Sequence, residues 1–216
     1  QVTAIASGLD KVGVDIIELS HGDGLAGSSI NYGFSATPEM ELIRAASQVV
    51  RHARLGVLLL PGVGTIEDLK EARANGAQVV RVATHVTEAD IAIQHLKAAR
   101  ELGMMPVGFL MMAHMAPPEK ILEQAQIFVD AGAEYVNIAD SAGYMTAAEC
   151  GADYIDVTCR GLGAGAGNAQ AEVVAGVFQR LGYSTGLDFY SYMDLAENVV
   201  EPIMQRPQII KSAPLM

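Results

Sequence analysis

The chain has 216 residues, of which half are hydrophobic and 18% are charged, and its formal net charge at neutral pH is −11. This length allows one large domain with a sizeable core, while the acidic excess and the scattered lysines and arginines argue against nucleic acid as a partner. No apolar run reaches the roughly 18 residues of a membrane span, no secretory signal opens the chain, and two cysteines make no disulfide framework, so we expect no membrane partner and a cytoplasmic location.

Six apolar runs each end in a short cluster of polar and glycine residues, which is typical of buried parallel strands. The predicted strands, in chain order, are Val14–Leu19, Leu55–Leu60, Val79–Ala83, Pro106–Ala113, Tyr135–Ala139 and Tyr154–Val157. Helical patterns precede and separate these runs, which predicts a parallel sheet with helices outside it. The predicted helices are Val2–Val12, Pro38–Arg54, Thr65–Ala74, Thr87–Leu102, Pro117–Ala131, Ala169–Leu181 and Asp188–Met204.

Two of the predicted helices begin with a recognisable cap. Thr65 is followed three residues later by Asp68, a pattern related to the capping box. Thr37 is expected to cap a helix that has Pro38 at its first position. Two histidines, His52 and His95, fall within helical patterns, and we expect both on the surface.

The spacing of the strands indicates that the sheet lacks two of its members. Only ten residues separate Gly143 from Tyr154, whereas a parallel crossover needs about a dozen or more. The first helix, Val2–Val12, has no strand before it. Adding one strand at each place to the six observed gives the eight of a (β/α)8 TIM barrel, here without its first strand and without one strand–helix unit near Cys150. The alternative, a doubly wound open sheet, lacks the Gly-x-Gly-x-x-Gly turn that would support it.

We assign residues 1–187 to this partial barrel and residues 188–216 to the start of a C-terminal helical region.

Residues with catalytic chemistry gather at the carboxyl ends of the predicted strands, where parallel α/β folds bind their ligands. The longest such loop opens with His21-Gly22-Asp23-Gly24, which could bind a metal, move protons or form an ordinary turn. His85 and His114 each end a strand and could bind a ligand, act as a base or make structural hydrogen bonds. The sequence has no His-x-His or His-x-x-x-His pair, so a metal site is incomplete.

Two charged residues interrupt apolar strands and therefore need partners. Glu18 would be costly to bury unpaired, and its partner is a cation, either from the missing first strand or from this chain. Arg81 is expected to pair with Glu18 or Asp140 rather than to bind substrate. Asp140-Ser141 presents a carboxylate and a hydroxyl that either face a ligand or hold their own loop. Asn168 ends a glycine-rich loop and is expected to be a helix N-cap, or an N-cap that is a ligand in addition.

Taken together, these motifs resemble the 4-hydroxy-2-oxovalerate aldolase family. The segments that carry the resemblance are Glu18–Leu25, Ser28-Ser29, Asn31–Phe34, Leu58–Gly62, Arg81–His85, Gly108–His114, Ala139–Gly143 and Gly163–Asn168. The resemblance implies a TIM barrel of the group that includes hydroxymethylglutaryl-CoA lyase. It implies cleavage of a 4-hydroxy-2-oxo acid, such as 4-hydroxy-2-oxopentanoate, to pyruvate and an aldehyde, as in aromatic hydrocarbon catabolism. Mn2+ or another divalent cation would stabilise the enolate, a base would take the 4-hydroxyl proton, and an acylating acetaldehyde dehydrogenase would be the partner.

The resemblance also assigns roles to individual residues. Leu58 and Leu60 match leucines of the aldehyde pocket, and Ser141 matches a serine near pyruvate. Glu18 matches a glutamate that pairs with an arginine of the missing first strand, and Asn168 matches an asparagine near the metal. The resulting candidates are Glu18 and Ser141 for catalysis, Leu58, Leu60, His21, His85 and His114 for substrate binding, and Asn168 for metal binding.

The sequence also departs from the family's pattern. The family's Leu-Arg-Asp-Gly segment with its following His, and the His-x-His pair of its seventh strand, are missing from these 216 residues. We therefore expect that this chain alone neither binds the cation nor shows appreciable aldolase activity. Two alternatives stay open: an inactive barrel remnant that serves binding or assembly, and a related lyase or synthase for another oxo acid. The motifs at His21–Gly24 and Leu58–Gly62 argue against the latter.

Overall fold

The computed structural model describes residues 1–139, 153–162 and 168–204, which form two compact units. The sheet unit comprises Ile16–Val50 and Arg54–Ala152. The helical unit comprises Gln1–Asp15, Arg51–Ala53 and Asp153–Met216. The division expected at residues 187 and 188 stays a prediction.

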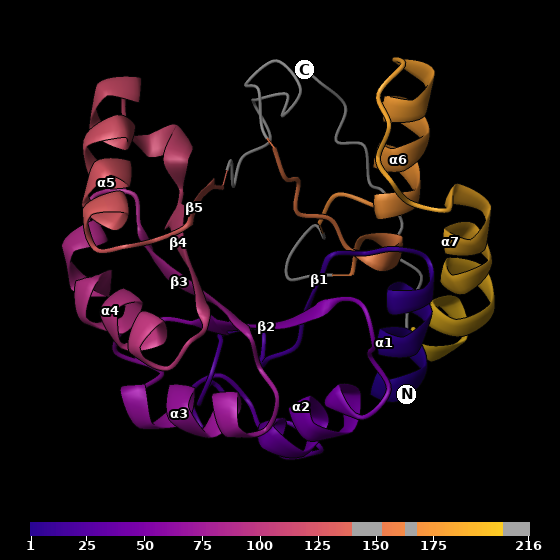
Figure 1. Ribbon diagram of the computed structural model, residues 1–216, viewed down its shortest axis with the longest axis horizontal. Coiled ribbons are helices and arrows are strands. Elements are labelled where there is room, and N and C mark those ends of the chain that lie inside the picture. Colours follow the sequence, from indigo (N-terminus) through magenta and orange to yellow (C-terminus); the bar gives the residue numbers. More distant parts are fainter. Residues whose placement is uncertain (140–152, 163–167, 205–216) are drawn as a thin grey trace. The chain divides into compact units, whose positions relative to one another are not determined.

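All strands of the sheet unit run parallel, and their order in space is their order in the sequence (Figure 1). This order is expected of a barrel built from consecutive strand–helix units. The first five predicted strands are confirmed, with ends displaced by a few residues at most. They are β1 (Ile16–Glu18), β2 (Arg54–Leu59), β3 (Val79–His85), β4 (Met105–Met111) and β5 (Tyr135–Ile138).

The helices between these strands lie along the outer side of the curved sheet, in chain order (Figure 1). Thr65 caps its helix as predicted, because its hydroxyl accepts the Asp68 N–H at 3.2 Å while the Asp68 carboxylate accepts the Thr65 N–H at 2.8 Å. The cap predicted at Thr37 is wrong, because Pro38 itself is extended and occupies the capping position without a side-chain bond. The elements are α2 (Glu39–Ser47), α3 (Ile66–Ala74), η1 (Ala89–Ala92), α4 (Ile93–Glu101), η2 (Ala113–Met115) and α5 (Pro118–Asp130).

The face of the sheet beneath these helices is the apolar core. Phe128 on α5 packs so closely on β4 that a Cβ at Gly108 would lie 2.2 Å from its ring, so only glycine fits there. Because side chains alternate along a strand, the residues between these core positions face the opposite, concave side. Strand residues and helix residues of this core include Val57, Leu59, Val80, Val82, Leu110, Leu69, Leu96 and Phe128.

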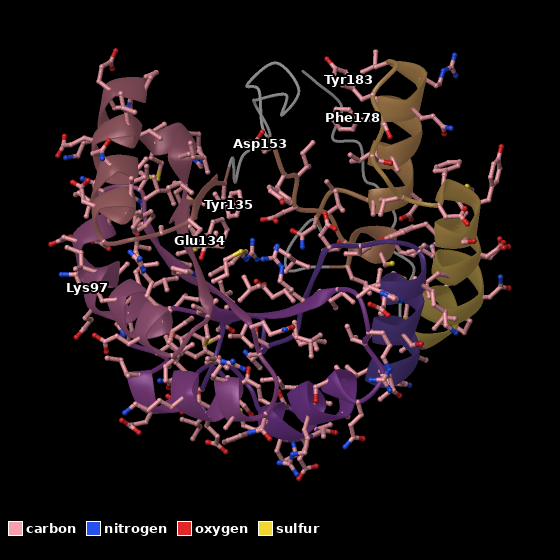
Figure 2. All side chains as sticks on the ribbon, in the orientation of Figure 1. Lys97, Glu134, Tyr135, Asp153, Phe178 and Tyr183 are labelled. Atoms are coloured by element: carbon pink, nitrogen blue, oxygen red, sulfur yellow. The ribbon has the colours of Figure 1, made fainter. Side chains whose placement is uncertain are left out.

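The helical unit is built from helices around a small apolar cluster that includes Val12, Tyr192 and Leu195. Phe178 and Tyr183 meet edge to face at the end of one helix, with ring centroids 5.6 Å apart (Figure 2). Its elements are α1 (Val2–Lys11), η3 (Cys159–Gly161), α6 (Ala171–Arg180), α7 (Phe189–Leu195), the π-helical turn η4 (Ala196–Val200) and η5 (Glu201–Ile203).

Two further expectations fail in particular places. The sixth predicted strand, Tyr154–Val157, is not a strand: Tyr154 and Ile155 are 51% and 38% exposed, and the bridge nearby joins Thr158 to Gln170. The last predicted helix breaks into α7, η4 and η5, with Pro202 inside η5.

The two helical histidines also differ from expectation. The helix expected to reach Arg54 ends at Ser47, so His52 is exposed but lies in a bend beyond it. His95 lies on α4 but is only 5% exposed, and burial lowers the pKa of its imidazole. Its ring therefore belongs to the core rather than to the surface.

Candidate active site

A paired arginine and glutamate mark the concave face of the sheet. The Arg81 guanidinium on β3 donates to both carboxylate oxygens of Glu18 on β1, with Nη2–Oε1 at 2.7 Å and Nε–Oε2 at 2.5 Å. Arg81 also lies over the Phe109 ring, 4.6 Å from its centroid. The side chains of Arg81 and Glu18 are 20% and 28% exposed, so two-point pairing compensates most of the cost of removing both charges from water.

This pair confirms the expectation that Arg81 binds Glu18. The other partner considered for Arg81, Asp140, lies outside the described residues. Glu18 thus has a cationic partner within the chain, whereas the resemblance implied an arginine from the missing strand. We regard the pair as a fixed polar feature of the concave face.

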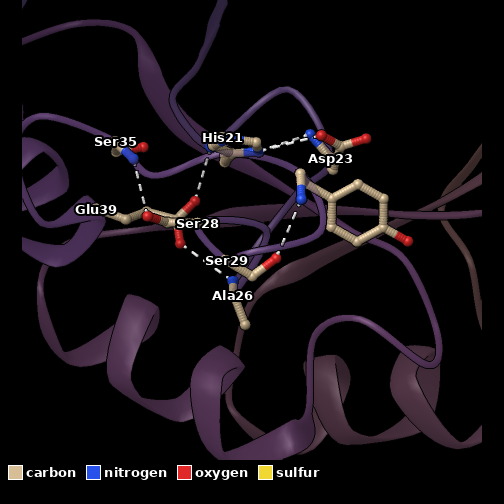
Figure 3. A network of polar contacts seen from close by, with 8 residues as sticks. His21, Asp23, Ala26, Ser28, Ser29, Ser35 and Glu39 are labelled. Carbon is tan, nitrogen blue, oxygen red and sulfur yellow. Dashed lines mark hydrogen bonds and ion pairs between the residues drawn. The ribbon is translucent and has the colours of Figure 1, made fainter.

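The loop after β1 is held by a carboxylate from the next helix. Figure 3 shows Glu39, the first residue of α2, between the two ends of a short loop segment. Its Oε1 accepts the His21 N–H at 2.8 Å, and its Oε2 accepts the Ala26 N–H at 3.2 Å. Ala26 has a φ of 62°, a backbone conformation that non-glycine residues rarely adopt. Glu39 therefore fixes the loop that carries His21, a role that the sequence analysis missed.

The His21 ring is fixed on one side. Its Nδ1 lies 3.1 Å from the Asp23 N–H nitrogen and 3.3 Å from the Asp23 Oδ2 (Figure 3). A Cβ at Gly27 would lie 2.7 Å from this nitrogen, so the glycine lets the backbone approach the ring closely. When the imidazole is neutral, Nδ1 accepts from the backbone and the proton is on Nε2. Nε2 is then a hydrogen-bond donor for a ligand.

The same loop lies against the end of β2. The Leu25 N–H donates to the Leu58 carbonyl at 2.8 Å, and the Leu58 N–H donates to the Ser20 hydroxyl at 3.3 Å. A Cβ at Gly24 would lie 2.9 Å from the Leu58 carbonyl oxygen and 3.2 Å from the Leu60 side chain. The structure therefore brings the His21 loop and the two candidate leucines together.

His85 and His114 lie at the ends of the next two strands. His85 Nδ1 is 3.0 Å from the Thr87 hydroxyl, so the tautomer of the ring decides which group donates. His114 lies exposed in the short helical turn η2 after β4. Backbone bonds from Val86 to Met111 and from Ala113 to Ala139 keep these strand ends together. Both histidines are available to a ligand at this edge.

The remaining candidates do not join this group. Ser141 lies outside the described residues. Asn168 belongs to the helical unit, is exposed, and donates from Nδ2 to the Leu162 carbonyl at 3.1 Å. Its expected role as N-cap is wrong, because α6 begins after Gln170. The cause is the segment 168–170, which bonds back to Gly161 and Thr158 before the helix starts.

The described residues do not fit the divalent cation that the resemblance implies. Among them, no group of three or more histidine, cysteine, aspartate or glutamate side chains is placed to hold a metal ion. His21 Nδ1 already accepts a hydrogen bond from the Asp23 N–H, and the Glu18 carboxylate is already paired with Arg81. We therefore derive no chemical step through a metal. No helix within the described ranges has the length and apolar character needed to cross a membrane.

Comparison with known proteins identifies the family of this chain. The model of the HMGL-like family matches residues 1–150 and 144–199. The chain belongs to the HMGL-like family. It is 54% identical to the 4-hydroxy-2-oxovalerate aldolase of Moorella thermoacetica and 51% identical to that of Carboxydothermus hydrogenoformans, in both cases over 100% of this chain and 75% of the relative. The aldolase of Mycobacterium avium is 46% identical over 94% of this chain and 69% of the relative.

The relatives contain residues that this chain lacks. The alignment with the Moorella protein runs over 252 positions, although this chain has 216 residues. The two matches of the HMGL-like family model meet at residues 144–150. This is the place where strand spacing predicts a missing strand–helix unit, and it lies within a segment that the structure does not describe.

Solved structures agree on the fold. Hydroxymethylglutaryl-CoA lyase from Pseudomonas aeruginosa matches 96% of this chain and 87% of its own, with a TM-score of 0.74 at 15% identity. The carboxyl transferase domain of Rhizobium etli pyruvate carboxylase matches 91% of this chain and 42% of its own, with a TM-score of 0.75 at 13% identity. These similarities, with the family match and the sequential parallel sheet, confirm the TIM-barrel fold class.

Proposed function

We propose that this chain has the barrel and the substrate-binding residues of an aldolase that cleaves 4-hydroxy-2-oxopentanoate to pyruvate and acetaldehyde. The observation that carries the proposal is its 54% identity, over its whole length, to a protein named 4-hydroxy-2-oxovalerate aldolase. In this reaction the C3–C4 bond breaks and its electron pair passes to C3, which yields the enolate of pyruvate. The 4-hydroxyl group gives its proton to a base and becomes the aldehyde oxygen, and a proton added at C3 of the enolate completes pyruvate.

The concave face supplies groups suited to this substrate. Arg81 and Glu18 form a fixed pair whose guanidinium plane is held by two hydrogen bonds and by Phe109. A rigid pair of this kind orients a polar substrate at little entropic cost. Leu58 is buried and Leu60 is half-buried at the end of β2, and we assign them to the methyl end of the aldehyde.

We assign His21 to hydrogen bonding with substrate oxygen rather than to proton removal. Its Nδ1 accepts the Asp23 N–H, so in the neutral ring Nε2 carries the proton and can donate to a carboxylate or keto oxygen. His85 and His114 stand at the same edge and are assigned to substrate binding. Glu18 and Ser141 remain the proposed catalytic residues, and Asn168 the proposed metal-binding residue.

Cofactor, partner and location complete the proposal. A divalent cation, Mn2+ in the resembling family, would stabilise the enolate, but its main ligands lie outside the residues that this chain supplies. An acylating acetaldehyde dehydrogenase is the proposed partner, because it would consume the aldehyde. The buried free thiol of Cys159 supports a reducing compartment, the cytoplasm.

The test is to restore the two missing segments. The strand that would precede Gln1 and the unit that would lie between Cys150 and Gly151 are grafted from the Moorella relative. We expect Mn2+-dependent release of pyruvate from 4-hydroxy-2-oxopentanoate by the grafted protein, and only background release by the 216-residue chain. The matched control is the same graft with both histidines of its His-x-His pair replaced by alanine.

A folded graft that releases no pyruvate would refute the aldolase assignment. It would favour the second candidate, an inactive barrel that binds or assembles with other proteins. That candidate rests on one observation, the lack of any His-x-His pair in the sequence. Mn2+-dependent release by the unmodified chain would instead support the aldolase and disprove the expectation that these residues alone are inactive.

A further inference from the structure

A cleft of about 460 Å³ opens at the N-terminal end of the sheet, the end opposite the candidate active site. Because the strands are parallel, their first residues all lie at this end. Figure 2 labels one of its residues, Glu134, immediately before β5. The cleft lies entirely in the sheet unit, and its lining is Arg54, Arg73, Gln78, Arg100, Gly103, Met104, Met105 and Glu134.

The charge of this cleft is opposite to that of the chain. Three arginines and one glutamate line it, while the whole chain has a net charge of −11. Among the described residues, none of these arginines has a carboxylate oxygen within the 4.0 Å of an ion pair. The cleft of this acidic protein is therefore lined by three arginine charges and one glutamate charge, with no ion pair among the described residues that involves these arginines.

Two of the three guanidiniums donate hydrogen bonds to uncharged groups, and the third lies against a glycine. Arg73 donates from Nε to the Leu102 carbonyl at 3.2 Å. Arg54 donates from Nη1 to the Met105 sulfur at 2.9 Å. Arg100 packs against Gly132, where a Cβ would lie 2.5 Å from its Nη1. The two hydrogen bonds orient Arg54 and Arg73 without neutralising their charge.

Helix ends alone do not account for the cluster. An arginine in the last turn of a helix is favoured by the helix dipole. This effect explains why Arg73 ends α3 and why Arg100 ends α4, each taken separately. It does not explain Arg54, which begins a strand and lines the same cleft. Arg44 ends α2 in the same manner, yet it bonds Asn75 at 2.9 Å and does not line the cleft.

We propose that this cleft binds the phosphate group of a small molecule. A carboxylate has two oxygens and is satisfied by one guanidinium fork, whereas a phosphate offers oxygens to forks from several directions. Arg54, Arg73 and Arg100 come from three different elements and supply those directions. The volume leaves room for an organic group beyond the phosphate. The site is separate from the proposed catalytic edge and does not depend on the proposed function.

The test measures the binding of inorganic phosphate to the full chain by isothermal titration calorimetry at constant ionic strength. We expect saturable binding that becomes about tenfold weaker in Arg73→Gln and in Arg100→Gln, because each loses one charged fork. Glu134→Gln removes the negative charge of the cleft and is expected to tighten binding. The matched control is Arg44→Gln, which removes an arginine from the last turn of a helix outside the cleft. We expect this variant to bind phosphate with unchanged affinity.

Several outcomes would overturn the site. These are no saturable binding at millimolar phosphate, equal weakening in Arg44→Gln, or displacement of phosphate by pyruvate, which would place both at one site. Thermal unfolding followed by circular dichroism establishes that each variant is folded. If an arginine variant does not fold, Glu134→Gln decides the question, because unchanged or weaker binding there contradicts the proposal.

Discussion

The two units of this protein are stabilised in different ways. In the sheet unit, apolar side chains from successive strands and helices bury one another, and Phe128 is the largest of those fully buried. In the helical unit, polar groups hold segments that are far apart in sequence. The Asp10 carboxylate accepts the N–H groups of Arg51, His52 and Ala53 at 2.7–3.0 Å. Apolar burial therefore dominates the sheet unit, whereas the helical unit adds the hydrogen bonds of Asp10 to a smaller apolar cluster.

The largest effect is expected from the core of the sheet unit. Phe128→Ala removes a fully buried ring and leaves a cavity, which should lower the free energy of unfolding by about 4 kcal/mol. Urea denaturation measures the change. Val129→Ala, one residue further on the same helix but half exposed, is the control and should change stability by less than about 0.5 kcal/mol. Similar losses in both variants would show that the core does not lie where the structure places it.

The next effect concerns Asp10, which is 6% exposed. Burial by itself would raise the pKa of this carboxyl, but the bonds from Ala53, His52 and Arg51 outweigh it and hold the pKa below 3.8. Asp10→Ala leaves these donors without their acceptor and should cost about 3 kcal/mol at neutral pH.

The pH dependence of this loss follows from the direction of the pKa shift. Because the folded pKa is below the unfolded one, the stabilisation is fully present above pH 3.8 and disappears as the pH falls through the folded pKa. The difference between the wild type and Asp10→Ala in thermal unfolding should therefore shrink in acid. A difference that stays constant down to acid pH would show that the charge plays no part. Asp15→Asn, at an exposed acidic residue, is the control.

A smaller effect is expected at the concave pair. Arg81→Met leaves the Glu18 carboxylate without this partner, and the partial exposure of both side chains limits the cost to about 2 kcal/mol. A double-mutant cycle with Glu18→Gln isolates the interaction between the two residues. A coupling energy near zero would mean that the pair does not stabilise the fold.

The smallest effect is expected at a helix cap. Thr65→Ala removes one side of the capping box and should cost about 1 kcal/mol, measured by thermal unfolding. Thr37→Ala is the matched control, because the sequence predicts a cap there and the structure shows none. Equal costs at both positions would restore the cap predicted from sequence.

The sheet unit was the more predictable of the two because its signals are local. Each strand is an apolar run that ends in polar or glycine residues, and a cap such as Thr65 with Asp68 spans only four residues. Glu18 and Arg81 could be paired in advance because a charge within an apolar strand needs a partner. What sequence alone misplaced in this unit was limited to element ends and to His95, whose burial depends on neighbouring helices.

The helical unit and the loop anchor depend on partners that no local pattern shows. Tyr154–Val157 has the composition of a strand, but composition does not decide whether a strand forms, because strand hydrogen bonds join residues that are distant in sequence. The Glu39 carboxylate accepts backbone N–H groups 18 and 13 residues earlier in the chain. Because every residue except proline has a backbone N–H, the pattern of side chains does not indicate which of them Glu39 binds. The arginines of the cleft are likewise separated in sequence and meet only because α3 and α4 end beside the start of β2 and β4.

The position of α1 has a consequence for biosynthesis. This helix packs against α7, and Gly8 lies where a Cβ would come within 2.3 Å of the Leu195 side chain. Because α1 and α7 are far apart in the sequence, their contact forms late, whereas each strand of the sheet finds its neighbour soon after it is synthesised. During translation the strands of the sheet can therefore pair before α1 meets α7.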